Sequence, residues 1–143
     1  MGEYILVEPG RVVPSQDFLK EKTMAHILQC YKNHQENELP PPPMVRFDPN
    51  THHYVAIDGH NLLAIDDLLK HKTKVFVAKN ADDGLKGSSL GIEQRNKDLK
   101  EKFDQSLIEA ESLKTKNIKT IRDLRLKYPS LINESAAHKH YNL

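Results

Sequence analysis

The stretch from Tyr54 to Ala64 constrains the fold of this 143-residue chain more than any other. An apolar segment, 54–57, is typical of a strand, and it runs into Asp58-Gly59, where a helical pattern begins at once. A strand that ends in glycine at a helix N-terminus exposes backbone N–H groups and the positive end of the helix dipole. Anions, phosphates above all, bind such ends. Asp-Gly also closes many ordinary turns, and the pattern alone favours that simpler interpretation.

The segments before this stretch indicate strands and one helix. Residues 4–7 and 11–13 form short apolar bursts around the turn residues Pro9-Gly10, which predicts one or two short strands. Apolar residues then recur at three- and four-residue steps from Phe18 to about Asn33, which predicts an amphipathic helix with Ser15 as its N-cap.

A run of four prolines, 40–43, separates this helix from a predicted hairpin. Proline in such a run favours an extended, stiff backbone, and we interpret it as a connector rather than as a ligand for an SH3-type domain. The strands 44–47 and 52–57 follow, joined by Asp48-Pro49-Asn50. After the helix predicted over 61–70, Lys74–Ala78 reads as a further strand.

The composition changes after residue 84. Residues 85–91 are rich in glycine and serine and predict a loop, and the chain beyond them is polar and helical. One long amphipathic helix is expected from residue 92 to about 113 and a second over 118–126, followed by a loose tail, 135–143. Such helices pack back on the preceding domain or join two copies of the chain.

Charge and apolar content limit the classes of function. The chain has 21 basic and 20 acidic residues, so neither a nucleic-acid-binding protein of strongly basic type nor an acidic solvating chain is expected. The apolar runs are too short for a membrane span, and the N-terminus does not resemble a signal peptide. The single cysteine, Cys30, cannot form an internal disulfide, so we expect a cytoplasmic protein without a membrane partner.

Three segments resemble the ParB/sulfiredoxin superfamily, in which they occur in this order. They are Val12-Val13-Pro14-Ser15-Gln16, the proline-marked entry Leu39–Val45, and Asp58-Gly59-His60-Asn61-Leu62 before the strand Lys74–Ala78. The glycine motif is similar to Gly-Glu-Arg-Arg of ParB proteins, Gly-Cys-His-Arg of sulfiredoxins and Asp-Gly-His-His-Arg of kinase-like members. The resemblance covers roughly residues 4–80, and the chain would be a divergent member of the ParB-like nuclease type.

The resemblance implies a set of site residues. Asp58 and His60 would be catalytic, and Gly59, His60 and Asn61, with Ser15 and Gln16, would bind a nucleotide, ATP or CTP, together with Mg²⁺. Two alternatives remain open. Asp58 can simply cap the following helix, with His60 a polar surface residue, and Ser15 and Gln16 can serve to cap the earlier helix. The motif also departs from the family, since Leu62 stands where the family has an arginine and His60 where sulfiredoxins have their catalytic cysteine.

Two further groups of residues are candidates for a metal site and for a nucleic-acid contact. His52, His53 and His60 lack zinc-ligand spacing, so no zinc site is expected. The C-terminal region carries a local basic excess that is either a weak nucleic-acid contact or the solvated face of a helix: Lys116, Lys119, Arg122 and Arg125.

Together these observations predict an α+β protein, with a small mixed sheet, packed helices and a helical C-terminal extension. Residues 1–84 would form the ParB/sulfiredoxin-like domain, 85–91 a loop, 92–134 the extension and 135–143 a tail. The expected function is phosphate or nucleotide binding at Asp58–Asn61, serving nucleotide hydrolysis, phosphoryl transfer or DNA cleavage. The alternative is a catalytically degenerate module that binds nucleic acid or a protein, or forms a homo-oligomer, through its C-terminal helices.

Overall fold

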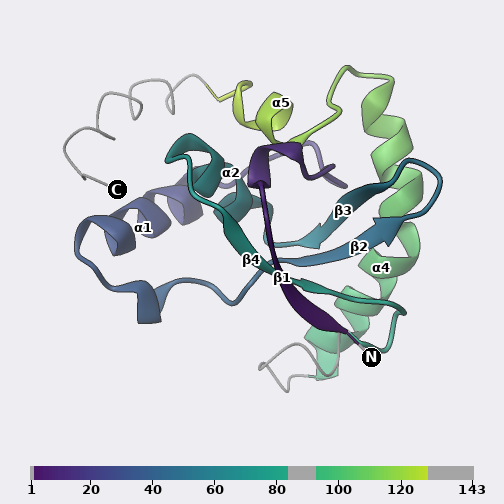
Figure 1. Cartoon of the computed structure of the whole chain (residues 1–143), viewed down its shortest axis with the longest axis horizontal. Coiled ribbons are helices and arrows are strands. Elements are labelled where there is room, and N and C mark those ends of the chain that lie inside the picture. Colours follow the sequence, from purple (N-terminus) through teal and green to yellow (C-terminus); the bar gives the residue numbers. More distant parts are fainter. Residues whose placement is uncertain (1, 84–92, 129–143) are drawn as a thin grey trace.

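A four-stranded mixed sheet organises the molecule in the computed structural model, which describes residues 2–83 and 93–128 (Figure 1). The strands are β1 (Glu3–Val7), β2 (Met44–Asp48), β3 (His53–Asp58) and β4 (Thr73–Val77), in the spatial order β1-β4-β2-β3. The pairs β1–β4 and β2–β3 are antiparallel and the pair β2–β4 is parallel. The predicted α+β class, the mixed sheet and the hairpin are therefore confirmed.

Helices cover both faces of the sheet. They are α1 (Glu21–Lys32), α2 (His60–Leu68), α4 (Glu93–Lys114) and α5 (Ile121–Arg125), with short 3₁₀ turns η1 (Pro9–Arg11) and η2 (Glu36–Glu38). Successive residues of a strand point to opposite faces, and the core follows this alternation. Val45 and Ala56 pack with α1, α2 and α5, whereas their neighbours Met44 and Ile57 pack with α4.

The described part of the predicted extension shares this core. Leu113, Ile118, Ile121 and Leu124 belong to the same buried cluster as the sheet and α2. On the other face, Leu99 and Phe103 of α4 pack beside strand residues. Of the two arrangements that the sequence left open for these helices, the described residues therefore adopt packing against the sheet.

The structure corrects one local prediction, at the start of the first helix, and narrows two others. The first helix begins at Glu21 rather than near Phe18, and Ser15 does not cap it, because its hydroxyl donates instead to the carbonyl oxygen of Ala56 at 2.6 Å. No second strand forms over 11–13, where a 3₁₀ turn is followed by a single bridge between Val13 and Val55. The helix predicted over 61–70 ends at Leu68.

Two further observations complete the fold. The loop expected over 85–91 and the tail over 135–143 lie outside the described residues. No helix in the described part of the chain is long and apolar enough to cross a membrane.

A candidate anion-binding cavity at the start of helix α2

Gly59 joins strand β3 to helix α2 in a conformation that favours glycine. Its φ angle is +88°, and it is the N-cap of the helix. A Cβ atom at this position would lie 2.6 Å from the Cβ of Pro43, the last of the four prolines. The backbone of Pro43 is itself fixed, because its carbonyl oxygen accepts a hydrogen bond from the Phe76 amide at 2.8 Å. The proline run thus enters the sheet against the strand-to-helix turn, as its interpretation as a connector predicts.

A cavity of about 300 Å³ opens at this turn. The cavity is lined by residues from the start of α2, from α1 and the segment before it, from the proline run and from α4. The lining residues are Gln16, Phe18, Lys20, Thr23, Ile27, Pro40, Pro41, Pro42, Asp58, Gly59, His60, Asn61, Leu62 and Lys102. Of the predicted site residues, Gln16 and Asp58–Asn61 line the cavity, and Ser15 contacts it through His60.

His60 is the buried member of the predicted site. Only 2% of its surface is exposed, and its Nε2 atom accepts a hydrogen bond from the backbone N–H of Ser15 at 3.0 Å. Burial lowers the pKa of His60 to about 4, because a desolvated imidazolium is unfavourable and the nearby Asp58 only partly compensates for that cost. His60 is therefore neutral at pH 7, and the bond from Ser15 assigns its proton to Nδ1.

Two lysines line the cavity. The ammonium of Lys102 lies 3.6 Å from a carboxylate oxygen of Asp58. Lys102 comes from α4, within the predicted extension, so that segment contributes to the candidate site. Lys20 precedes α1, and its backbone N–H donates to Oδ1 of Asn61 at 2.7 Å, which joins the two helix starts.

Neither lysine could be predicted as a site residue, because contacts between segments far apart in the chain leave no periodic pattern. Phe18 was assigned to the first helix, yet it lies before that helix at the cavity, and 47% of its surface is exposed. Gln16 is fixed locally, because its side-chain amide donates to the Phe18 carbonyl oxygen at 2.8 Å. Leu62 lines the cavity where the resemblance places an arginine.

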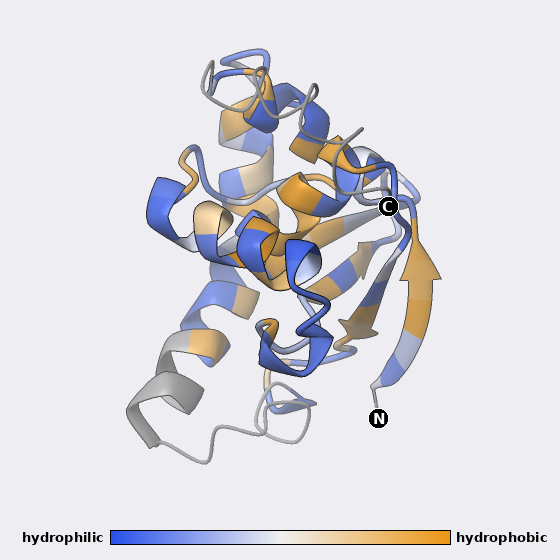
Figure 2. Cartoon of the chain, turned by 90° about the vertical axis from the view of Figure 1, so that its left-hand side faces the viewer, coloured by the Kyte–Doolittle hydropathy of each residue, from blue (hydrophilic) through white to orange (hydrophobic). Residues whose placement is uncertain are grey.

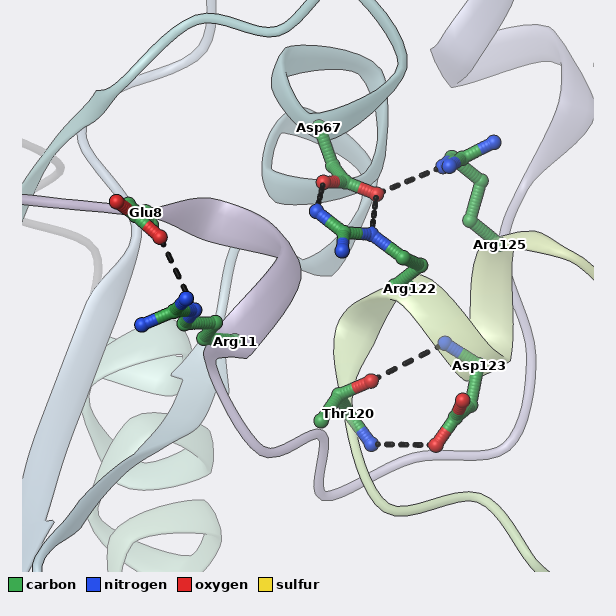
Figure 3. Close-up of polar contacts among 7 residues, drawn as sticks. All are labelled: Glu8, Arg11, Asp67, Thr120, Arg122, Asp123 and Arg125. Atoms are coloured by element: carbon green, nitrogen blue, oxygen red, sulfur yellow. Dashed lines mark hydrogen bonds and ion pairs between the residues drawn. The ribbon is translucent and has the colours of Figure 1, made fainter.

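The cations predicted for nucleic acid are largely engaged in ion pairs (Figure 3). Arg122 donates two hydrogen bonds to Asp67, from its Nη2 to Oδ1 at 2.8 Å and from its Nε to Oδ2 at 3.3 Å. Arg125 donates to the same carboxylate at 2.9 Å. At the surface, the Nζ of Lys116 lies 3.7 Å from the Oδ2 of Asp17. The side chain of Lys119 is exposed, and its backbone N–H donates to Asp123.

Within the described ranges, no group of three or more His, Cys, Asp or Glu residues is arranged to hold a metal ion. Comparison of the chain with family models, curated proteins and solved structures gave no match. What the site can do must therefore be inferred from its own geometry.

Proposed function

We propose that the chain binds a phosphate-bearing small molecule, a nucleotide, in the cavity at the start of α2. The observation that carries the proposal is the lining itself, in which Lys20 and Lys102 accompany the backbone of the Gly59 turn. Backbone N–H groups at a helix N-terminus and lysine ammonium groups are the donors that phosphates use in proteins. Two cations against the single carboxylate of Asp58 leave a net positive lining.

The remaining lining suits the non-phosphate part of a nucleotide. Phe18 presents an exposed aromatic ring at the cavity, and Ile27 and the prolines 40–42 add apolar surface. Aromatic rings stack on nucleobases with little preference for the base. An inorganic anion would use the lysines and the turn alone, whereas a nucleotide would also use this apolar wall.

The resemblance to ParB/sulfiredoxin proteins belongs to the same proposal. The mixed sheet and the strand–glycine–helix junction support it, as does the proline-marked entry beside Gly59. In this proposal Asp58 and His60 retain the roles that the resemblance implies, for nucleotide hydrolysis, phosphoryl transfer or DNA cleavage. The neutral imidazole of His60 would act through its Nδ1–H as a hydrogen-bond donor rather than as a cation.

Magnesium fits this lining poorly without the ligand. Among the described residues that line the cavity, Asp58 is the only one with a carboxylate, and the Lys102 ammonium already lies beside it. Mg²⁺ is commonly held by one or two carboxylates together with substrate phosphates. A bound triphosphate would have to supply most of the oxygen ligands, so nucleotide binding comes first in the proposal and Mg²⁺ follows it.

Asn61 offers a sharp test of phosphate binding. In Asn61→Asp a carboxylate oxygen can keep the hydrogen bond from the Lys20 amide, and an acid suits the first turn of a helix. The folded protein should therefore be as stable as the parent, while the new negative charge repels phosphate. We expect ATP, CTP, GTP or ADP, with or without Mg²⁺, to raise the Tm of the parent but not that of Asn61→Asp.

Asn117→Asp is the matched control, because it makes the same change of charge at an exposed position among the C-terminal lysines. It should keep the full thermal shift. At a nucleotide concentration one hundred times Kd, binding adds about 2.7 kcal/mol to the free energy of unfolding, which moves Tm by several degrees. Absence of a shift with every nucleotide, or an equal shift in both variants, would contradict the proposal.

A further inference from the structure

Strand β1 forms an edge of the sheet, and no described residue pairs with its outer side. Its inner side pairs with β4 from Glu3↔Val77 to Val7↔Thr73. Figure 2 shows this strand at the border of the molecule, with apolar residues over much of its length. An apolar edge of this kind can accept another strand by backbone hydrogen bonding.

The register fixes which peptide groups point outward. The amide of Phe76 donates to Pro43, on the β2 side of β4, so the backbone groups of Phe76 point away from β1. Tyr4 lies opposite Phe76, and this is therefore a non-hydrogen-bonded pair of the antiparallel ladder. By the same alternation, the N–H and C=O groups of Tyr4 and Leu6 point to the outer edge, whereas those of Ile5 point to β4.

The side chains of the same two residues are exposed. Tyr4 is 49% and Leu6 67% exposed, on the sheet face opposite to the α1–α2 side, where Ile5 and Val7 pack. The Tyr4 ring makes an edge contact with Phe76, with ring centroids 5.2 Å apart, and the Lys74 ammonium lies 4.9 Å from its centre. Two exposed apolar residues thus coincide with the two outward-facing backbone positions.

We propose that a second copy of this chain pairs with β1 in antiparallel orientation, with the two-fold axis at Ile5. In this arrangement the outward N–H and C=O groups of Tyr4 form hydrogen bonds with those of Leu6 in the second copy. By symmetry, Leu6 pairs in the same way with Tyr4 of the second copy. The two Ile5 residues form the central non-hydrogen-bonded pair. Tyr4 also packs beside the second copy's Leu6 on one face of a continuous eight-stranded sheet.

Strand length and charge together select this register. An axis at Tyr4 or at Leu6 would also pair outward groups, but it would place Leu6 opposite Gly2 or Tyr4 opposite Glu8, both outside β1. An axis at Glu3 would place two Glu3 carboxylates opposite each other, which is unfavourable. An axis at Val7 would place Leu6 opposite Glu8. With the axis at Ile5, each Glu3 lies opposite Val7 and no charged residue of β1 faces another. The turn at Pro9–Arg11 follows directly and limits the ladder to this short segment.

The C-terminal helices, one of the surfaces that the sequence left open for self-association, are less suitable. Their apolar residues Phe103, Leu113, Ile121 and Leu124 are buried within the chain itself. The exposed Ile108 lies on α4, whereas the exposed Leu126 directly follows α5. Backbone pairing at β1 needs no such surface, and it is independent of the nucleotide cavity.

Analytical ultracentrifugation of the full chain tests the proposal. We expect the parent to sediment as a dimer, and Leu6→Lys to sediment as a monomer at the same concentrations. Leu126→Lys is the matched control at another exposed leucine, and it should remain a dimer. Leu6→Pro is a second variant, because it removes an outward N–H without breaking the ladder to β4, so it should be a folded monomer by circular dichroism.

Cross-linking tests the register. Ile5→Cys should form a covalent dimer on mild oxidation, because the two cysteines would face each other in a non-hydrogen-bonded pair. Glu3→Cys, which would face Val7, should form much less. A parent that is monomeric at every concentration would overturn the proposal and leave this edge to a strand of a different protein. A dimer that persists in both Leu6 variants would also overturn it.

Discussion

The two ends of helix α2 use the same kinds of polar residue in opposite ways. At the N-terminal end, the backbone turn at Gly59, the lysines and Asn61 face an open cavity. At the C-terminal end, two adjacent carboxylates, Asp66 and Asp67, are buried, and each already has its partners. One end lines an open cavity with lysines and the Gly59 turn, whereas the carboxylates at the other end have partners within the chain. The difference indicates where binding can occur and where the chain is held together.

The carboxylates of Asp66 and Asp67 have different kinds of hydrogen-bond partner. Asp67 receives two arginines of α5, which joins α2 to the C-terminal part of the fold (Figure 3). Within the described part of the chain, the Asp66 carboxylate accepts hydrogen bonds only from hydroxyl groups, those of Tyr31 on α1 and Thr73 on β4, and His71 is close by. Burial raises the pKa of Asp66, and the hydroxyl donors and His71 only partly oppose that rise.

Breaking the Asp67 contacts should have the largest effect. In Asp67→Asn both arginines lose a charged partner, and the side chain of Arg125 is itself largely buried. We expect the free energy of unfolding to fall by about 4 kcal/mol, as for other buried ion pairs that lose one partner. Urea denaturation at pH 7 measures the change.

The exposed pair of Glu8 and Arg11 provides the control, because both side chains are more than half exposed. Glu8→Gln should change the free energy of unfolding by less than about 0.5 kcal/mol. If Asp67→Asn costs no more than Glu8→Gln, Asp67 does not anchor α5, and Arg122 and Arg125 would be available to an external anion.

Acid should act on the N-terminal end of α2 through His60. The pKa of this group is about 4 in the folded protein and near 6.5 when unfolded, so between these values the unfolded chain binds more protons. The contribution of neutral His60 to the free energy of unfolding is therefore fully present above about pH 6.5. As the pH falls towards 4, this contribution decreases by about 2 to 3 kcal/mol. Urea denaturation between pH 7 and pH 4 should show this loss in the parent and not in His60→Gln.

The exposed histidine His52, in the hairpin turn, supplies a matched substitution. His52→Gln should follow the parent over the same pH range. If His60→Gln and the parent lose stability in parallel, the buried imidazole is not the group that makes the fold sensitive to acid.

Local chemistry explains what the sequence could predict at these two ends. Gly59 was recognisable because a turn residue between an apolar strand and a helical pattern is a signal within a few residues. The hairpin before it was predicted for the same reason. Ser15 was misassigned as a helix cap, because a serine before an amphipathic pattern has the same local signature whether it caps a helix or, as here, bonds to a strand.

Contacts between distant segments explain what the sequence could not predict. The partners of Asp67 lie on α5, and Lys102 reaches Asp58 from α4. In the sequence these residues look like ordinary surface charges on amphipathic helices. Leu62 shows the reverse case, since its apolar character suggested a core position, and it is both buried and part of the cavity lining.

The smallest effect should come from Asp66, and its sign should be opposite to that of His60. Because the pKa of Asp66 is raised in the folded protein, the folded chain takes up this proton first as the pH falls, and acid favours the folded state at this position. Asp66→Asn cannot take up that proton. Relative to Asp66→Asn, the parent should therefore gain stability as the pH falls from 7 to 4, measured by urea denaturation of both proteins. A relative loss in the parent would mean that the hydroxyls of Tyr31 and Thr73 stabilise the carboxylate more than burial destabilises it. Both ends of α2 would then resist acid poorly, and the contrast between them would rest on the cavity alone.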